Sequence, residues 1–239
     1  MADGNDIIRT ADICDDHGDA VLICEIPFND YAARNHFHGQ VVTFATYEDN
    51  KGIRDVLAEA ATWDDTVLRL EVEDQAHSHE LLRRGETLAA VTSDPEPVQG
   101  CSVEPLGTMR YLAAAAPALL ERSGSREPDW SRMPVVVFNA KDTLQHDLLA
   151  QELGERVAPP THRVPTSADF LEALALGLGW GMVPETQLLP LERAGRLARL
   201  APDRHVDVPL HWQRWRLDSL LLGRVTEAVR RAASAHLRR

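Results

Sequence analysis

The sequence has few of the residues and segments that mark membrane, secreted or disulfide-stabilised proteins. It has only three cysteines, Cys14, Cys24 and Cys101, and aromatic residues make up 5%. Because the number of cysteines is odd and no Cys-x-x-Cys pair occurs, we expect reduced thiols. No apolar run approaches the roughly 20 residues that span a bilayer, and the acidic N-terminus lacks the basic start and apolar core of a signal peptide. These absences predict a cytoplasmic protein that does not bind a membrane.

Basic side chains are also scarce. The sequence has 25 Lys and Arg against 37 Asp and Glu, and its formal net charge is −12 at pH 7. Residues 1–60 hold 12 acidic and four basic side chains, which gives a net charge of −8. Because phosphate binding depends on clustered Lys and Arg, this segment is a poor candidate for nucleic-acid binding. The one basic region is the predicted last helix, where the helix dipole favours cations near the C-terminus; a nucleic-acid contact is the alternative.

The sequence does contain a regular alternation of strand-like and helix-like segments from residue 41 onward. Short apolar runs and period-2 patterns predict strands, and apolar residues at helical spacing predict helices. The alternation is typical of an α/β fold with mostly parallel sheets and helices on both faces. The predicted strands are VVTFATY (41–47), TVLRLEVE (66–73), LAAVTSD (88–94), MRYLAAAA (109–116), MPVVVFN (133–139), WGMVPE (180–185) and DVPLHWQRWRL (207–217), and helices include KGIRDVLAEAA (51–61) and TLQHDLLAQEL (143–153).

The segment FLEALALGLGWGMVPE (170–185) has glycines at alternate positions, Gly177, Gly179 and Gly181. In a dinucleotide-binding loop the glycines follow a strand and begin a helix, whereas here a predicted helix ends and a strand begins. A helix C-terminus presents carbonyl groups, so a phosphate site is not expected. The segment predicts a helix C-cap followed by close helix–sheet packing. The functional alternative is that Gly179 and Gly181 form a wall that lets a small ligand approach the backbone.

Three predicted strand-end loops carry small polar and acidic residues ahead of a helix. Ser or Thr in such a position is often only an N-cap, which is the structural alternative. In open α/β sheets, however, ligands bind outside the carboxyl ends of the strands, where helix N-termini favour a carboxylate and an acidic side chain favours an ammonium. The loops therefore predict a site for a free amino acid, preferably a cationic one, with Asp94 or Asp142 as the ammonium partner. The loops are Thr92-Ser93-Asp94, Asn139 with Asp142 and Thr143, and Thr166-Ser167 with Asp169.

Residues 62–239 resemble the effector-binding domain of LysR-type transcriptional regulators, and among these the regulators of lysine and arginine export. The strings that carry the resemblance are VLRLEVEDQAHSHELLRRGETLAAVTSDPEPVQGCSVEPLGTMRYLA, MPVVVFNAKDTLQH, VPTSADFLEALALGLGWGMVPE and DVPLHWQRWRLDS. The resemblance implies two α/β lobes like those of periplasmic binding proteins, an effector cleft between the lobes, and a dimer. It implies L-lysine or L-arginine as the effector.

The resemblance also implies domain boundaries and site residues. Residues 41–105 and 206–239 would form lobe I, residues 106–205 would form lobe II, and crossover strands would run near residues 102–108 and 203–209. By position, the side chains expected to line the effector cleft include the polar loops described above. They are Thr92, Ser93, Asp94, Phe138, Asn139, Asp142, Thr166 and Ser167.

The N-terminal region departs from this family. A full regulator begins with a winged helix-turn-helix and a linker helix, whereas residues 1–60 are acidic and contain no basic recognition helix, so we expect no direct DNA binding from this chain. The strings TADICDDHGDAV and PFNDYAARNHFHGQVVTFATYEDNKGIRDVL, within residues 10–58, resemble the start of ribonuclease-regulator A proteins and their relatives, the metal-dependent 4-hydroxy-4-methyl-2-oxoglutarate aldolases. Ala32-Ala33 replaces the usual glycine pair, and the later motifs that supply the aldolase site have no counterpart. The alternative function is therefore a truncated, inactive member of that family.

The two resemblances meet near DVLAEAATWDD (55–65). Both families run strand, loop and helix here, so residues 41–47 and 51–61 are predicted to replace the first strand and helix of the sensor and to complete the sheet of lobe I. Residues 1–40 would remain as an acidic N-terminal segment. The loop between strand and helix carries Glu48 and Asp49, which join Gly179 and Gly181 as candidate additional residues of the cleft wall. These carboxylates would either reinforce selectivity for cations or spoil the site.

Other residue clusters do not indicate a metal site or catalysis. His36 and His38 are two residues apart, as are His77 and His79, but no Cys or carboxylate at ligand spacing accompanies either pair, so we expect packed or solvent-facing histidines. The sequence has no Gly-x-Ser-x-Gly, His-Glu-x-x-His or phosphate-binding loop motif.

The sequence as a whole predicts a ligand sensor that is not an enzyme and that uses no cofactor and no metal. It is expected to respond to a basic amino acid by a shift in lobe closure. The expected protein partner is a second copy of the chain or, in a heterodimer, an intact regulator.

Trp212 and Trp215 lie three apart on a predicted strand, which places one of them in the core and the other at a rim or interface.

Overall fold

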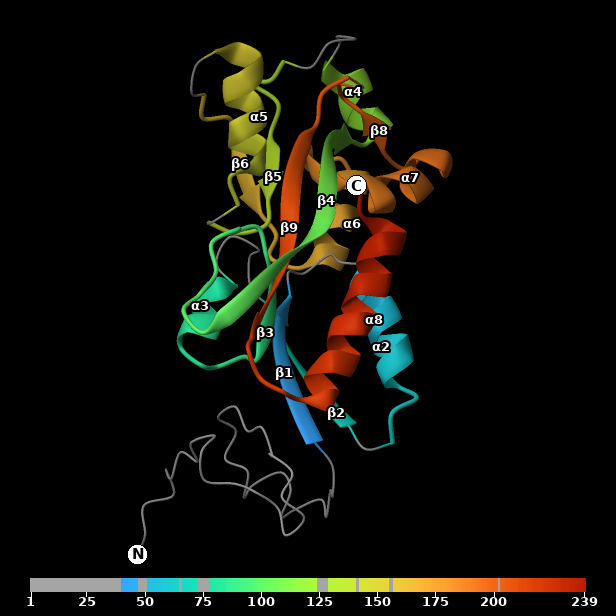
Figure 1. Ribbon diagram of the computed structural model, residues 1–239. Coiled ribbons are helices and arrows are strands. Elements are labelled where there is room, and N and C mark those ends of the chain that lie inside the picture. The colour runs from blue at the N-terminus through green and yellow to red at the C-terminus, as the bar shows by residue number, and fades with distance from the viewer. Residues whose placement is uncertain are drawn as a thin grey trace, which may run out of the picture. The chain divides into compact units, whose positions relative to one another are not determined.

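The computed structural model describes residues 40–46, 51–64, 66–72, 78–123, 129–140, 142–154, 157–201 and 203–239. The chain divides into two compact units (Figure 1). Of the described residues, those from Gln40 to Gly107 and Leu210–His236 belong to unit 1, and those within Thr108–Pro209 and Leu237–Arg239 belong to unit 2. Several residues that the sequence singled out lie outside the described residues, namely Cys14, Cys24, His36, His38, Glu48, Asp49 and His77.

Unit 1 is built on a sheet with the strand order β2–β1–β3–β9. The strand β1 (Gln40–Thr46) lies between β2 (Thr66–Val72) and β3 (Ala89–Thr92) and is parallel to both. On the other side of β3, β9 (Val206–Trp215) pairs with it in the antiparallel direction. The prediction that the strand after residue 40 completes this sheet is confirmed, because β1 forms hydrogen-bonded ladders with neighbours on both sides.

Two helices of unit 1, α2 (Lys51–Ala60) and α8 (Leu220–His236), lie side by side (Figure 1). The helix α8 buries a stripe of apolar residues at helical spacing, which is why this segment forms an amphipathic helix. Among its basic side chains, Arg231 forms an ion pair with Glu59 of α2 at 2.5 Å, and Arg224 lies over the Trp63 ring. No helix among the described residues is long and apolar enough to cross a membrane. The buried stripe comprises Leu221, Leu222, Val225, Ala228, Val229, Ala232 and Ala233.

Unit 2 contains two groups of strands. The strand β4 (Cys101–Ala115) enters from unit 1 and pairs in the antiparallel direction with β7 (Gly181–Pro184) and β8 (Ala198–Arg199). The short strands β5 (Val135–Val137) and β6 (Thr161–Arg163) form a parallel pair. A parallel bridge between Val135 and Trp180 connects the start of β5 to the residue that precedes β7. The core is a cluster of Leu112, Ala114, Val136, Phe170, Leu174, Val183, Leu188 and Leu197.

Four helices are described in unit 2: α4 (Pro117–Ser123), α5 (Leu144–Leu153), α6 (Ser167–Ala175) and α7 (Glu185–Arg193). The sequence patterns named above include no helix over residues 185–193, and α7 contains Pro190, a residue that disfavours a helix interior. The helix forms nonetheless, since it buries Leu188 completely in the core of unit 2. Tertiary burial therefore outweighs the local cost of the proline.

The chain changes unit inside β4, after Gly107, inside β9, before Leu210, and again after His236. The last change differs from the predicted boundary, which assigned all of residues 206–239 to lobe I. Its physical cause lies at Arg238, which exchanges two backbone hydrogen bonds of 2.8 and 3.0 Å with Thr108. The Arg238 guanidinium also donates to Glu185 Oε2 at 2.7 and 3.0 Å. These contacts hold residues 237–239 against unit 2.

The two tryptophans of β9 occupy different environments. Trp212 is fully buried, and its indole Nε1 donates to Thr226 Oγ1 of α8 at 3.1 Å. Trp215 is half-buried and packs against a smaller cluster that includes Leu82, Val98 and Cys101. The prediction of one core tryptophan and one at a rim is confirmed.

Candidate functional site

The glycine-rich segment that follows α6 is a helix C-cap. Gly177 has a φ of +79°, in the left-handed region that favours glycine. The backbone N–H of Leu178 donates to the Ala173 carbonyl at 3.0 Å, and that of Gly177 donates to Leu174 at 2.9 Å. These bonds satisfy carbonyl groups that the helix end would leave unpaired. The predicted C-cap is confirmed, and its Gly177 carbonyl also accepts a hydrogen bond of 3.0 Å from Arg122.

The next two glycines allow close packing of the chain on itself. A Cβ atom on Gly179 would lie 2.5 Å from the Pro134 carbonyl oxygen, and one on Gly181 would lie 2.8 Å from Phe170 Cζ. Protein atoms thus occupy the space that a side chain would need, which confirms the predicted close packing and accounts for both glycines without a ligand. A role for Gly179 and Gly181 in an effector wall stays a prediction.

The first predicted ligand loop follows β3 in unit 1. Thr92 is the last residue of the strand and is fully buried, whereas Ser93 and Asp94 are half-buried in the loop. The backbone N–H of Asp94 donates to Thr92 Oγ1 at 3.1 Å, and Asp94 Oδ1 accepts the backbone N–H of Glu96 at 2.9 Å. The Asp94 side chain is 32% exposed. The Asp94 carboxylate is thus partly exposed and held by its own loop.

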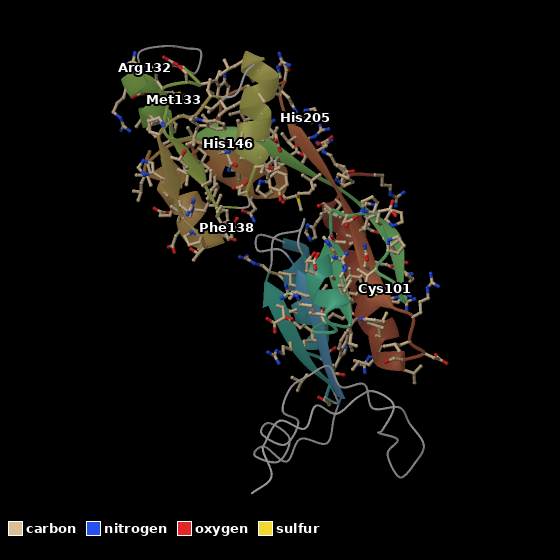
Figure 2. The ribbon with its side chains drawn as sticks, turned by 90° about the vertical axis from the view of Figure 1, so that its left-hand side faces the viewer. Cys101, Arg132, Met133, Phe138, His146 and His205 are labelled. Carbon is tan, nitrogen blue, oxygen red and sulfur yellow. The ribbon has the colours of Figure 1, made fainter. Side chains whose placement is uncertain are left out.

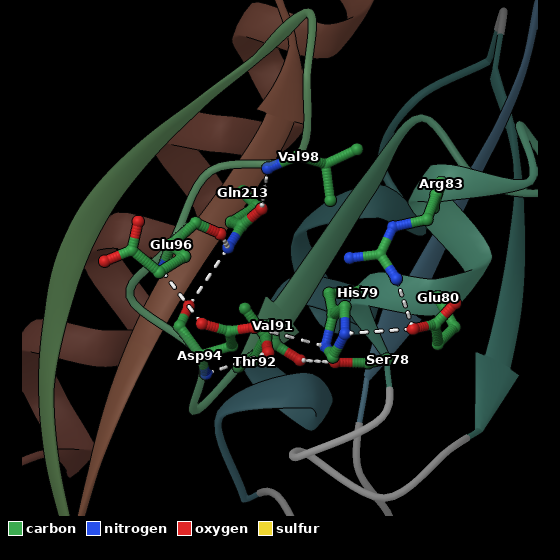
Figure 3. A network of polar contacts seen from close by, with 10 residues as sticks. All are labelled: Ser78, His79, Glu80, Arg83, Val91, Thr92, Asp94, Glu96, Val98 and Gln213. Atoms are coloured by element: carbon green, nitrogen blue, oxygen red, sulfur yellow. Dashed lines mark hydrogen bonds and ion pairs between the residues drawn. The ribbon is translucent and has the colours of Figure 1, made fainter.

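A buried glutamine on the neighbouring strand fixes this loop (Figure 3). Gln213 of β9 is fully buried, and its side-chain nitrogen donates to the carbonyl oxygens of Asp94 at 3.0 Å and Glu96 at 2.8 Å. Its side-chain oxygen accepts the backbone N–H of Val98 at 3.2 Å. The amide therefore bonds three backbone groups between residues 94 and 98.

A histidine lies on the other side of the Asp94 carboxylate (Figure 3). His79 Nδ1 is 3.7 Å from Asp94 Oδ2, and its Nε2 is 3.2 Å from Glu80 Oε1. The sequence left open whether His79 is packed or solvent-facing, and its side chain is 15% exposed, which makes it a packed histidine. The preceding residue, Ser78, is buried and donates to the Val91 carbonyl at 2.6 Å, so the start of α3 (His79–Arg83) is tied to β3 beside the loop.

The second predicted loop follows β5 in unit 2 and is organised by one carboxylate. Asp142 Oδ2 accepts the backbone N–H of Phe138 at 2.9 Å, and Asp142 Oδ1 accepts that of Leu144 at 3.2 Å. Asn139 Oδ1 in turn accepts the backbone N–H of Asp142 at 3.1 Å. Both carboxylate oxygens therefore hold the turn that leads into α5. The half-buried Phe138 side chain packs against the unit 2 core (Figure 2).

The third predicted loop follows β6 and leads into α6. Thr166 is the N-cap of the helix: its hydroxyl oxygen accepts the Asp169 backbone N–H at 3.4 Å and its hydroxyl group donates to Asp169 Oδ2 at 2.5 Å. Ser167 is the first helical residue and is half-buried. Because β5 and β6 are parallel and paired, with Val137 opposite Arg163, the loops with Asn139 and with Thr166 leave the strands at the same end.

Sequence reasoning missed two buried glutamines that support these loops. Gln213 is described above, and Gln145, 1% exposed on α5, donates to Asp142 Oδ2 and to the Val136 carbonyl, both at 3.1 Å. In the sequence these glutamines lie among apolar and polar residues, in LHWQRW and in TLQHDLL, so the local pattern does not mark them as buried. A buried side-chain amide must be hydrogen-bonded, and both of these glutamines meet this need chiefly by bonding to backbone groups of a loop or strand. Pattern alone does not indicate which backbone.

The clear pKa shifts lie away from these loops. Burial raises the pKa of the Cys101 thiol to about 11, and the nearby Arg216 charge lowers it in part. The Asp207 carboxylate has a lowered pKa, chiefly because Arg110 donates two hydrogen bonds of 2.7 Å to it. Cys101 is a neutral core thiol and the Arg110–Asp207 pair is half-exposed. Among the described residues, no group of three or more His, Cys, Asp or Glu side chains could hold a metal ion.

Comparison with known proteins identifies what the described units are similar to. Residues 55–234 match the family described as the LysR substrate binding domain. The lysine export transcriptional regulatory protein LysG of Corynebacterium efficiens is 48% identical over 185 residues, which cover 77% of this chain and 63% of that protein. The chain thus spans less than two thirds of the length of this curated relative. The resemblance predicted for residues 10–58 is not supported by these matches.

Solved structures agree with the sequence matches. ArgP from Mycobacterium tuberculosis superposes with a TM-score of 0.78 and 38% identity, covering 84% of this chain and 69% of that one. The full-length LysG of Corynebacterium glutamicum with bound effector Arg superposes with a TM-score of 0.76 and 43% identity, covering 83% of this chain and 69% of that one.

Proposed function

The chain belongs to the LysR substrate binding domain family, and on that premise we propose that it senses a free basic amino acid, L-arginine or L-lysine. The observation that carries the proposal is its 43% identity to a LysG regulator whose structure contains the effector Arg. Each unit by itself carries polar strand-end loops of the kind that bind a charged ligand, after β3 in unit 1 and after β5 and β6 in unit 2. This function follows from binding and not from catalysis.

We assign the ligand's charged groups to particular loops. The N-terminus of α6, with Thr166 and Ser167, suits a ligand carboxylate, because the first backbone N–H groups of a helix carry partial positive charge. The Asp94 carboxylate suits a cationic group, since its side chain is 32% exposed and its Oδ1 is held in place by the backbone N–H of Glu96. Asp142 has a different role, because three donors within its own loop and helix already hold its carboxylate in place.

A thermal-shift series tests this function. A ligand at 100 times its dissociation constant stabilises the folded protein by about 2.7 kcal/mol. For a chain of this length such a stabilisation raises the melting temperature by roughly 5–10 °C. We expect this rise with L-arginine or L-lysine and not with L-norleucine, which has no cationic side chain. A cooperative melt that no basic amino acid shifts would contradict the proposal.

The sensor is proposed to have no enzymatic activity. The curated relative named above is a transcriptional regulatory protein, which supports binding as the function of this family. An assay of divalent-metal-dependent cleavage of 4-hydroxy-4-methyl-2-oxoglutarate tests the aldolase alternative, and we expect no product. Metal-dependent release of pyruvate above the rate of a buffer blank would establish the aldolase function instead.

The proposed partners are a second copy of this chain or, in a heterodimer, a full-length regulator of the same family. Sedimentation velocity of the purified chain should give the mass of a dimer. Direct DNA binding is not part of the proposal, and a gel shift on the DNA upstream of the gene should show no specific complex. Sequence-specific binding that weakens with rising salt would show that this chain binds DNA by itself.

A further inference from the structure

Gln213 is not among the proposed ligand contacts, but its buried side-chain amide is hydrogen-bonded to the loop that carries Asp94 (Figure 3). It lies on β9, more than one hundred residues along the chain from the loop that it contacts. All the hydrogen-bonding contacts that it makes with this loop go to backbone atoms: two carbonyl oxygens, of Asp94 and Glu96, and one N–H, of Val98.

The contacts require a primary amide. The two carbonyl oxygens need donors and the N–H needs an acceptor, and among side chains of this length only glutamine supplies both from one planar group. The pattern also fixes the amide orientation, because the reversed amide would place its oxygen against two carbonyl oxygens. Gln213 is therefore matched to the path of the backbone from Asp94 to Val98.

Among the described residues, few other contacts hold Pro95 to Pro97, and the turn ends at Val98, which is buried and whose carbonyl accepts the Cys101 N–H at 2.8 Å. Pro95, Glu96 and Pro97 are exposed, and neither proline has a backbone N–H to donate. Thr92 Oγ1 holds the N–H of Asp94 at 3.1 Å, and the Asp94 carboxylate itself holds the N–H of Glu96 at 2.9 Å. The Asp94 carboxylate, which is proposed to bind the ligand, is thus part of a turn whose backbone is hydrogen-bonded to Gln213.

We propose that Gln213 is a positioning residue, which holds the turn from Asp94 to Val98 so that the Asp94 carboxylate meets the cationic group of the ligand. The proposal rests on the proposed binding of a basic amino acid and adds the residue that sets its preference for a charged ligand. Without the amide, the turn samples other backbone positions, and the fixed carboxylate that distinguishes a guanidinium from a neutral group of the same shape is lost.

Isothermal titration with L-arginine and L-citrulline tests the proposal, because citrulline replaces the guanidinium with a neutral group of nearly the same shape. The readout is the ratio of the two dissociation constants. Gln213→Met keeps the length and packing of the side chain and removes its hydrogen bonds, and Gln213→Glu keeps the acceptor for Val98. Asp94→Asn removes the charge that Gln213 positions. Gln151→Glu makes the same chemical change on the exposed surface of α5 and serves as the matched control.

We expect the wild type and Gln151→Glu to prefer arginine strongly, and Gln213→Met and Asp94→Asn each to lower the preference by about tenfold. Gln213→Glu sets a carboxylate against the carbonyl oxygens of Asp94 and Glu96, so it should lower the preference at least as much as Gln213→Met, and either variant that melts cooperatively gives the answer. A structural role alone would lower the melting temperature or weaken both ligands equally, and either result without a change in the ratio overturns the proposal. An unchanged ratio in Asp94→Asn overturns it as well. A wild type that binds neither ligand contradicts the proposed function itself.

Discussion

Replacing Gly179 by alanine should destabilise unit 2 severely. The added Cβ would lie 2.5 Å from the Pro134 carbonyl oxygen, 3.0 Å from its carbonyl carbon and 3.1 Å from Val136 Cγ2. The first two are backbone atoms, so a rotamer change does not relieve the overlap. The same carbonyl oxygen accepts the Trp180 backbone N–H at 2.9 Å, at the bridge between β5 and β7. Relief of the clash therefore stretches a buried hydrogen bond.

The expected loss of stability is the sum of the steric overlap and the weakened hydrogen bond. Overpacking a well-packed core costs about 1–3 kcal/mol, and a buried hydrogen bond contributes about 1 kcal/mol. We expect Gly179→Ala to lower the free energy of unfolding by about 3 kcal/mol, which corresponds to roughly 6–12 °C in melting temperature for a chain of this size.

Urea denaturation followed by far-UV circular dichroism measures this loss. The matched control is Gly223→Ala on the exposed face of α8, where an added Cβ meets nothing within 4 Å. Alanine is a better helix former than glycine, so the control should gain about 0.5–1 kcal/mol. If Gly179→Ala unfolds at the same urea concentration as the wild type, the close packing does not explain this glycine. Contact with a ligand would then be the remaining explanation for a glycine at position 179.

Three further predictions concern buried or paired groups. Thr226→Val leaves the buried Trp212 indole N–H without its acceptor and should cost about 1–3 kcal/mol in urea denaturation; no loss would contradict the hydrogen bond. In a variant without the other two cysteines, Cys101 should react with Ellman's reagent at pH 8 only as fast as the chain unfolds, because burial raises the pKa of its thiol to about 11; rapid native labelling would contradict its burial. Arg110 lowers the pKa of Asp207, so the pair stabilises the folded chain fully at pH values above the ordinary pKa of a carboxyl group. This stabilisation is lost as the pH falls through the lowered pKa. The difference in stability between wild type and Asp207→Asn should therefore be largest near neutral pH and vanish in acid, and a difference independent of pH would refute the pair's contribution.

The α/β fold with LysR-like, periplasmic-binding-protein-like architecture was predictable from the sequence, and the comparisons confirm it. Strands such as β3 and β5 are short apolar runs bounded by polar loops, so local pattern and burial point to the same structure. The helix α7 was not predictable from local pattern, because burial of Leu188 compensates for Pro190 only after the chain has folded.

The candidate site was predictable in part. Strand-end position identified Asp94, Asn139, Asp142 and Thr166 as polar loop residues, because the carboxyl ends of strands in such sheets carry binding loops. Their individual tasks were not predictable. That Asp142 holds the turn into α5, and that Asp94 rests on a glutamine far away in the sequence, depends on contacts that only the folded chain brings together.

The decisive measurement is a calorimetric titration of the purified chain with L-arginine. If the chain binds a basic amino acid, the titration should saturate at one ligand per chain, and the Asp94→Asn variant should bind with lower affinity. A chain that melts cooperatively but takes up neither L-arginine nor L-lysine at millimolar concentration would contradict that function.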